Sequence, residues 1–249
     1  MSYSQTVFLS LVQGLTEFLP ISSSGHLVIF QKLFGIEKPP VLFDIMIHVG
    51  TLGAILFYLK RELLVAFKKI RVWWLVILGS IPAGLIGGFL NREIEVLFNS
   101  LNLVGASFLV TAIFLFSTKW LGKLTKSVEK ISVVDALLVG LFQALAILPG
   151  VSRSGSTIVA GLWRQIDRKA AFRFSFYLAI PAISGAFLLQ VPDLLNVPAD
   201  NLGQGVLGMI VAGLTGYGAL RMLEAILLRA KLWIFGIYCV ILGLAVLLF

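Results

Sequence analysis

The chain consists of long apolar runs separated by short charged loops. A helix rises about 1.5 Å per residue, so each run is close to the length that crosses a hydrocarbon core of about 30 Å. We therefore expect these runs to form transmembrane helices. The six candidate crossings are Val41–Leu59, Val72–Leu90, Leu101–Thr118, Phe174–Gln190, Leu202–Leu220 and Leu232–Phe249.

Two further apolar runs, Ser4–Phe34 and Val133–Arg164, are interrupted midway by proline, glycine and serine. In the first run, Pro20 and Gly25 bracket three consecutive serines. Proline breaks a helix, and irregular backbone is tolerated at membrane depth only where protein buries it or water reaches it. We expect each run to form a re-entrant helix–loop–helix that enters and leaves by the same side of the membrane.

Composition excludes an ordinary soluble domain. Hydrophobic residues make up 59% of the chain, charged residues make up 13%, and the mean hydropathy is +1.00. These values are typical of an all-α polytopic membrane protein, whereas a β-barrel would alternate apolar and polar residues. The N-terminus lacks the basic region and cleavage site of a signal peptide, so we expect it to be mature. One cysteine, Cys239, permits no disulfide within the chain.

Positive charge is distributed unequally between the loops of the two sides. The formal net charge is +8, from 20 Lys and Arg against 12 Asp and Glu. With the interrupted runs counted as re-entrant, one set of loops holds most of the cations and the other holds only Lys32, Lys38 and Arg92. Because cytoplasmic loops are enriched in Lys and Arg, we expect the basic loops inside and both termini outside. This placement explains the charge without a nucleic-acid partner.

The second half of the chain resembles the first when Leu11 is aligned with Leu141. Each half then has one re-entrant pair and three crossings, and because three is odd the second half is inverted in the membrane. Inverted-topology repeats are found in many transporters and place functional groups near the midplane. We expect ten helical segments in a single integral membrane domain, 1–249, with repeats at about 1–125 and 130–249. The coinciding pairs include Gln13/Gln143, Leu15/Leu145, Ser22/Ser152, Ser24/Ser154 and Gly25/Gly155.

Glu17 is a carboxylate inside an apolar run, and it follows Gln13 by one helical turn, so the two side chains share a face. Ionisable groups at membrane depth are costly and usually functional. A nearby cation would keep Glu17 charged, and either Arg153 or a divalent metal would serve. The structural alternative is a buried Glu–Arg pair without chemistry.

Ser22, Ser23 and Ser24 follow Glu17 and precede His26. A serine needs a base to act as a nucleophile, and His26 is close in sequence. The alternative is that the serines are small packing residues or bond the backbone around the break. His26 would then be a structural histidine at a helix end.

Arg153 lies in the second interrupted run, within a loop rich in serine and glycine. Its guanidinium presents donors in a fork suited to phosphate oxygens, and backbone N–H groups at a helix N-terminus add to an anion site. We expect a phosphate cradle between the two loops, with a purely structural Arg153 as the alternative. The cradle residues would be Ser22, Ser24, Ser152, Arg153, Ser154, Gly155 and Thr157.

Other polar residues carry weaker signals. Asp44 and His48 share a helical turn and are candidates to line the site, with a structural role as the favoured alternative. Either Gln13 or Gln143 is expected to bond the opposite loop. No zinc spacing, dinucleotide-binding glycine pattern or Walker A motif occurs. Three charges near helix ends are interpreted as interface charges: Asp135, Asp167 and Arg173.

These residues indicate two polar loops that meet in the membrane and bind an anionic, phosphorylated ligand. Because the site is reached from within a bilayer, a lipid phosphate fits well. The alternative function is that of a lipid-phosphate flippase or an anion transporter, which would move its ligand across the membrane without hydrolysing it. A structural membrane subunit would leave Glu17, His26 and Arg153 unexplained.

Both loops resemble motifs of the undecaprenyl-diphosphate phosphatase family, also known for bacitracin resistance. The family's first motif is Glu/Gln-x-x-x-Glu followed by Phe-Leu-Pro-x-Ser-Ser-x-Gly-His, here Gln13 to His26. Its second motif is Pro-Gly-x-Ser-Arg-Ser-Gly, here Pro149 to Gly155. The length and hydropathy of the whole chain agree with the family.

The resemblance implies hydrolysis of undecaprenyl diphosphate to undecaprenyl phosphate and inorganic phosphate, which returns the lipid carrier to peptidoglycan and envelope-polymer synthesis. It implies a multi-pass protein of the bacterial cytoplasmic (inner) membrane, with a site open to the outer side. It also implies a divalent cation, Mg²⁺ or Ca²⁺. Membrane lipids are further partners, and a homodimer is compatible with the sequence.

The resemblance also implies roles for the matching residues. Glu17 is an essential acid that binds metal or handles a proton, and Arg153 clamps phosphate. Ser23 and His26 are alternative nucleophiles, with His26 otherwise an acid/base, and attack by water is a third route. Gln13 stands at the first acidic position, so this chain has one carboxylate fewer where a metal would bind.

Overall fold

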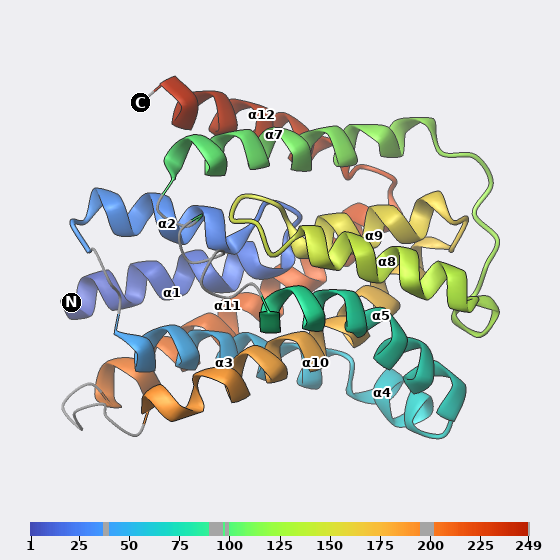
Figure 1. The fold of residues 1–249 in the computed structure, drawn as a ribbon, viewed down its shortest axis with the longest axis horizontal. Helices are drawn as coiled ribbons and strands as arrows, with labels where there is room; N and C mark the ends of the chain where they lie inside the picture. Colours follow the sequence, from blue (N-terminus) through green and yellow to red (C-terminus); the bar gives the residue numbers. More distant parts are fainter. Residues whose placement is uncertain (37–39, 90–96, 98–99, 195–201, 249) are drawn as a thin grey trace.

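A computed structural model describes residues 1–36, 40–89, 97, 100–194 and 202–248, and these are mainly helical (Figure 1). Each helix follows an apolar run, because in lipid the backbone polar groups must be satisfied within the segment. The α-helices are α1 (Tyr3–Phe18), α2 (Ser23–Leu33), α3 (Val41–Tyr58), α4 (Lys60–Phe67), α5 (Ile70–Phe89), α7 (Leu101–Ser117), α8 (Val133–Leu145), α9 (Arg153–Trp163), α10 (Arg168–Leu194), α11 (Leu202–Leu228) and α12 (Trp233–Leu248). Two short 3₁₀ helices are η1 (Thr118–Trp120) and η2 (Val128–Lys130).

Five helical segments are long and apolar enough to cross a membrane, which confirms an all-helical, multi-pass membrane protein. Of the predicted crossings, the last forms α12, whose 16 residues make it shorter than the other five. Leu90 and Phe249, at the ends of two predicted crossings, lie outside the described residues. The five segments are Val41–Tyr58, Ile70–Phe89, Leu101–Trp120, Arg168–Gln190 and Leu202–Leu228.

Each interrupted run forms its own pair of helices, joined by a non-helical break. Leu19 precedes Pro20 and is extended (φ −62°, ψ 144°), as the residue before proline usually is, so α1 ends at Phe18. The second break contains Gly150 with φ 97°, a conformation that favours glycine. We call residues 19–22 the first tip and residues 146–152 the second tip.

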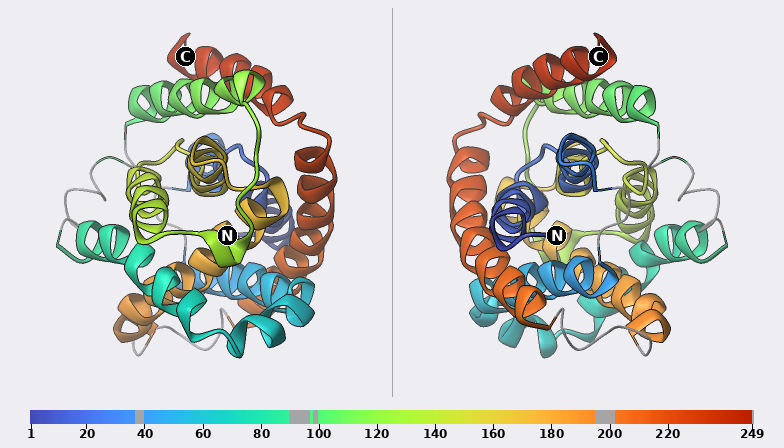
Figure 2. Two further views of the ribbon diagram at one scale, coloured as in Figure 1. Left: turned by 90° about the vertical axis from the view of Figure 1, so that its right-hand side faces the viewer. Right: turned by 90° about the vertical axis from the view of Figure 1, so that its left-hand side faces the viewer.

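The two helix pairs approach each other from opposite ends of the molecule (Figure 1). α1 and α2 extend from the end that carries both termini, α8 and α9 extend from the other end, and the tips meet near the middle. The end-on views show α2 and α9 inside a ring of longer helices (Figure 2). The ring therefore surrounds the polar tips and separates them from the surrounding lipid.

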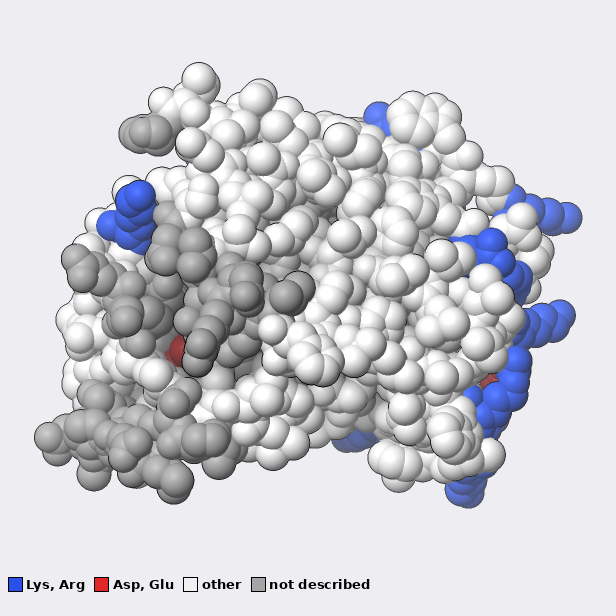
Figure 3. Space-filling model, in the orientation of Figure 1, with Lys and Arg blue, Asp and Glu red and all other residues white. Residues whose placement is uncertain are grey.

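On the face shown in Figure 3, Lys and Arg gather at the end away from the termini, which we call the basic end. This gathering agrees with the unequal distribution of charge between the loops. Of the few cations assigned to the other side, Lys38 and Arg92 lie outside the described residues. Which end faces the cytoplasm stays a prediction.

Helix α4 lies where the sequence indicated only a charged loop. Its Leu63 and Ala66 are each 5% exposed against the protein, whereas Leu64, Val65 and Phe67 are exposed. An amphipathic helix of this kind lies along the membrane interface. The predicted crossings Phe174–Gln190 and Leu202–Leu220 were also too short, because α10 and α11 continue into charged residues that hydropathy assigned to loops.

Asp135 is fully buried at the start of α8, so it is not the interface charge that the sequence indicated. Its carboxylate accepts from Lys126 at 3.0 Å and from Arg164 at 2.7 Å. It also accepts from the Ser132 backbone N–H at 3.0 Å, within a capping box. These bonds join the outer ends of α8 and α9 and so fix the second helix pair.

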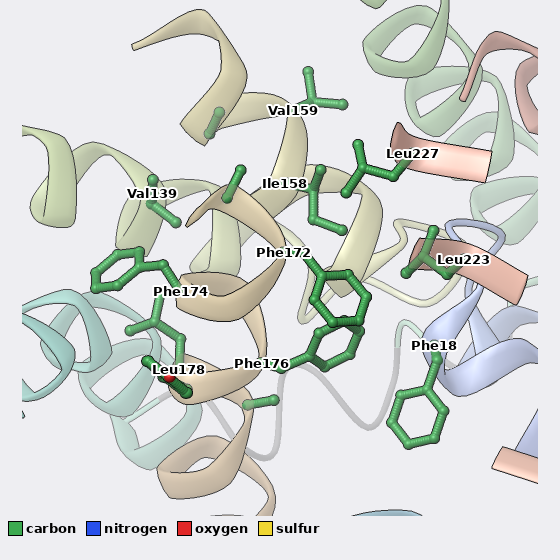
Figure 4. Packing of buried hydrophobic residues seen from close by; sticks show 14 of the residues in the cluster. Phe18, Val139, Ile158, Val159, Phe172, Phe174, Phe176, Leu178, Leu223 and Leu227 are labelled. Atoms are coloured by element: carbon green, nitrogen blue, oxygen red, sulfur yellow. The ribbon is translucent and has the colours of Figure 1, made fainter. Parts of the chain in front are cut away.

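Buried aromatic rings form the core behind the tips. Phe172 and Phe176 of α10 lie between Ile158 of α9 and Phe18 of α1 (Figure 4). Phe18 and Phe176 meet edge to face with ring centroids 5.6 Å apart, an arrangement that aromatic pairs prefer. This packing fixes α10 against both helix pairs.

We expect Gly140→Ala to destabilise the protein by about 1–3 kcal/mol, because overpacking forces the helices apart. A Cβ at Gly140 would lie 2.1 Å from the Gly79 carbonyl oxygen, where α8 crosses α5. Gly53→Ala is the matched control, since a Cβ there meets nothing within 4 Å. Thermal unfolding in detergent should show a lower Tm for Gly140→Ala alone, and equal Tm values would contradict the close crossing.

Candidate active site

An ion pair joins the two helix pairs at their tips. Arg153 Nη2 donates to Glu17 Oε1 at 2.7 Å, and the two side chains are 14% and 9% exposed. Glu17 lies one residue before the end of α1, and Arg153 is the first residue of α9. The structure thus brings together the carboxylate and the guanidinium predicted from the sequence, at a depth where each needs the other.

Ser23 contacts Glu17, not His26. Its Oγ donates to Glu17 Oε2 at 2.6 Å, and Gln13 Nε2 donates to the same oxygen at 3.2 Å. Sequence proximity had suggested His26 as the base for a serine. In the structure the Ser23 hydroxyl is hydrogen-bonded to the Glu17 carboxylate instead.

His26 is buried and held through both ring nitrogens. Its Nδ1 lies 2.7 Å from the Ser22 carbonyl oxygen, which only accepts, so we assign the proton to Nδ1. Its Nε2 lies 2.7 Å from the Tyr238 hydroxyl, which donates to it when the imidazole is neutral. The two rings are nearly parallel, at 4°, and the edge of Phe108 completes the enclosure.

Tyr238 is a site residue that sequence reasoning missed. It comes from α12, far along the chain, inside a run that reads as purely apolar. The available signal was its phenol, because a tyrosine hydroxyl in an apolar run usually has a polar partner. Thr111 of α7 was missed as well, and it joins the second tip by donating to Gly150 O at 2.9 Å and accepting from Ser152 N at 3.0 Å.

Ser22 connects the two tips. Its backbone is in the left-handed half of conformational space (φ 65°), which is unusual for a residue with a side chain. Its Oγ accepts from the backbone N–H of Gly25 at 3.4 Å and of Gly150 at 3.1 Å. Ser24 Oγ lies 3.3 Å from Ser22 Oγ, so both hydroxyls serve the contact between the tips.

The hydroxyls of the second motif also bond to protein. Ser152 Oγ caps α9 by accepting from Gly155 N at 3.0 Å, and Ser154 Oγ donates to the Leu19 carbonyl oxygen at 3.3 Å. Thr157 Oγ1 lies 2.6 Å from Ser175 Oγ. These groups hold Arg153 in place, and their contact with a phosphate stays a prediction.

Several buried polar atoms have no hydrogen-bond partner among the described residues. They are Arg153 Nη1, Gln13 Oε1, Ser156 Oγ and both amide atoms of Gln143. Gln143 therefore makes no side-chain hydrogen bond to the opposite loop, and Gln13 bonds Glu17 of its own helix, so neither of the two glutamines expected to reach across does so. Unsatisfied polar atoms in a buried site are costly, and at Arg153 and Gln13 they leave a donor and an acceptor for a ligand.

The carboxylates that could hold a metal are few. No group of three or more His, Cys, Asp and Glu comes together in the described part of the chain. Glu17 is the carboxylate at the tips, with the unpartnered Gln13 Oε1 on the same helix face. His48 Nδ1 of α3 donates to the Asp44 carbonyl oxygen at 2.8 Å, one turn earlier in the same helix.

Comparison with known proteins finds a matching family model and relatives of similar length. Residues 6–245 match the family model described as bacitracin resistance protein BacA. A relative from Desulfatibacillum aliphaticivorans is 42% identical, over 99% of this chain and 98% of its own. Relatives from Halothermothrix orenii and Carboxydothermus hydrogenoformans are each 41% identical, over 100% and 99% of this chain and 98% and 97% of their own. All three bear the name undecaprenyl-diphosphatase.

We expect Glu17→Gln and Arg153→Met each to cost about 3–5 kcal/mol of stability, because each leaves a buried charge without its partner. The double variant should lose much less than the sum of the two. Unfolding in mixed micelles at increasing denaturing detergent measures all four proteins of the cycle.

The same cycle on Lys69 and Glu129 is the control, since that 2.7 Å pair is 43% and 56% exposed. Its coupling should stay below about 1 kcal/mol. Additive losses for Glu17 and Arg153 would contradict a desolvated ion pair.

Proposed function

This chain belongs to the family of the bacitracin resistance protein BacA, and from this premise we propose that it hydrolyses undecaprenyl diphosphate to undecaprenyl phosphate and inorganic phosphate. The observation that carries the proposal is the contact of Arg153 and Ser23 with one buried carboxylate, Glu17. The reaction would regenerate the monophosphate carrier used for peptidoglycan and other envelope polymers. Resistance to bacitracin is the phenotype that the family name attaches to this activity.

Arg153 is the proposed clamp for the diphosphate. Its Nη2 is bound by Glu17, whereas its Nη1 is buried without a partner, so a phosphate oxygen would satisfy an existing donor. The prenyl tail would stay in lipid while the headgroup enters between the tips. Charge that develops on the transferred phosphoryl group is then met by a preorganised guanidinium in a dry site, where such stabilisation is largest.

Ser23 is the proposed nucleophile, with Glu17 as its base. The Ser23 hydroxyl already donates to Glu17 Oε2, which is the direction the proton takes when the oxygen attacks. Ser23 Oγ forms a bond to the terminal phosphorus as the bond to the bridging oxygen breaks, and undecaprenyl phosphate leaves. Water then attacks the phosphoserine, releases phosphate and restores the hydroxyl.

His26 is the proposed second proton-handling group. Its ring is fixed by Ser22 and by Tyr238, which leaves it oriented within the site. Two other routes use the same residues: attack by His26 itself, and direct attack by water with Glu17 and His26 as bases. The three routes differ in whether a phosphoserine, a phosphohistidine or no covalent intermediate forms.

The available oxygens would bind a divalent cation, Mg²⁺ or Ca²⁺, only weakly. The substrate would have to supply the remaining ligands. Glu17 and the unpartnered Gln13 Oε1 would hold the cation, and phosphate oxygens would supply further ligands. When bound, the ion would neutralise charge on the diphosphate. With one carboxylate at the tips, affinity for metal before substrate binds should be low.

The proposed topology is an inverted repeat of ten segments in the bacterial inner membrane. The approach of the helix pairs from opposite ends supports it, as does the gathering of Lys and Arg at the end away from the termini (Figures 1 and 3). The basic end would then be cytoplasmic, with both termini and the opening of the site on the outer side. The rival flippase or transporter would move substrate without hydrolysis, so phosphate released in detergent, without a second compartment, separates the two.

We expect Arg153→Ala to lower hydrolysis of farnesyl diphosphate by at least about 10²–10³-fold, because a buried phosphoryl group loses its counter-charge. Release of inorganic phosphate by purified protein is the measurement. Arg229→Ala removes an exposed arginine outside the site and should keep wild-type turnover. Normal turnover in Arg153→Ala would remove this residue from the mechanism.

We expect Ser23→Ala to lower turnover by at least about 10²-fold, and acid quenching of the wild type to trap a phosphoserine. Ser4→Ala is the control, because that exposed serine lies at the start of α1, away from the tips. Turnover by Ser23→Ala with an acid-labile phosphohistidine would assign the nucleophile to His26. Turnover without any phosphoenzyme would assign the attack to water.

A further inference from the structure

A second hollow opens at the basic end, away from the tips. It lies where α3 ends and α4 begins, against the first turns of α10 and the later turns of α11. Its volume of about 380 Å³ falls within the range of about 300–1,000 Å³ typical of small-molecule sites. The polar residues that line it are Tyr58, Lys60, Arg61, Glu62, Arg173 and Glu224.

The acids in this cavity already have partners. Glu62 accepts from Arg173 at 3.2 Å, and Glu224 accepts from the Tyr58 hydroxyl at 2.5 Å. Lys60 and Arg61, by contrast, form no ion pair with any described residue. The cavity therefore has a surplus of cationic donors, which suits an anion.

Buried aromatic rings separate the cavity from the active site. The Arg153 guanidinium carbon lies 5.8 Å from the centre of the Phe176 ring. From Phe176 the centroid distances are 4.8 Å to Phe172 and then 6.1 Å from Phe172 to Tyr58, which lines the cavity. Figure 4 shows Phe172 and Phe176 side by side in the core. Because both rings are buried, an ion in the cavity has no contact with Arg153.

We propose that this cavity is a second anion site, which binds the phosphate of a phosphomonoester or free inorganic phosphate. Arg61 and Lys60 supply charge-assisted donors, and Tyr217, which also lines the cavity, adds a hydroxyl, whereas the Tyr58 hydroxyl is already donated to Glu224. Phe57 at the rim is 60% exposed, and Lys60 lies 4.4 Å from its ring centre. An exposed aromatic beside a lysine is typical of the membrane interface, so a lipid phosphate can reach the site with its tail outside.

The test is equilibrium binding of radiolabelled inorganic phosphate to the purified full chain in detergent. The double variant Glu17→Gln/Arg153→Met removes the proposed clamp at the tips without leaving a buried charge unpaired, and binding should persist in this variant. Adding Lys60→Ala and Arg61→Ala should weaken the remaining affinity at least about tenfold, since each lost charge-assisted bond contributes appreciably. Lysophosphatidic acid that competes at far lower concentration than glycerol phosphate would identify a lipid headgroup, and equal competition would identify free phosphate.

Lys123→Ala with Lys130→Ala is the matched control, because it removes two exposed cations of the same end that do not line the cavity. Affinity should then stay within about twofold of the parent. An equal loss in the control would show that the effect is one of general positive charge, and loss of all binding in Glu17→Gln/Arg153→Met would show that the tips hold the one phosphate site. Either result overturns the proposal. Farnesyl diphosphate hydrolysis by Lys60→Ala/Arg61→Ala should be unchanged, so the outcome is independent of the proposed activity.

Discussion

The ion pair between Glu17 and Arg153 is the constraint around which the fold is arranged. Neither charge is tolerated alone at membrane depth, and each comes from a different broken helix. The breaks let each helix pair turn back near the middle of the molecule, where Glu17 at the end of α1 meets Arg153 at the start of α9. Pro20 and Gly150 lie at these breaks. The side chains of Ser22 and Thr111 form hydrogen bonds with the backbone of Gly150 in the second tip. The surrounding long helices exclude lipid from these polar groups.

The resting site is electrically balanced, and this shapes how a diphosphate can bind. Glu17 already occupies one guanidinium nitrogen of Arg153 and the Ser23 hydroxyl. An incoming phosphate therefore competes with a carboxylate. The observed affinity equals the affinity of the open state multiplied by the fraction of molecules in which the ion pair is open. The unpartnered Nη1 of Arg153 allows the contact to begin before the pair is broken. A cation held by Glu17 and Gln13 would favour the same exchange.

Much of this architecture was predictable because a membrane permits few backbone conformations and few isolated polar groups. Long apolar runs had to become helices, and two runs interrupted by Pro, Gly and Ser had to place their polar groups together. The meeting of Glu17 with Arg153 followed from the cost of an isolated buried charge. The choice of Glu17 over His26 as the partner of Ser23 did not follow, because it depends on how the first tip turns at Ser22.

Contacts between distant elements other than the Glu17–Arg153 ion pair did not follow from the sequence. The phenol of Tyr238 indicates that it needs a polar partner, but that the partner is His26 depends on how α12 packs beside the tips. Hydropathy also misjudged charged helical segments, since it measures solvation and not backbone conformation. That is why α4 and the charged extensions of α10 and α11 were assigned to loops.

Helix α4 has a consequence for how deep the molecule sits in its bilayer. Its exposed Leu64, Val65 and Phe67 favour the boundary between acyl chains and headgroups, and neighbouring cations are drawn to an anionic leaflet. A single residue, Leu59, separates α4 from α3, so this anchor resists vertical sliding of the whole bundle. The tips are thereby held at a constant level. A long-chain carrier must lower its headgroup to that level, and local thinning of the leaflet, not movement of the protein, would shorten its path.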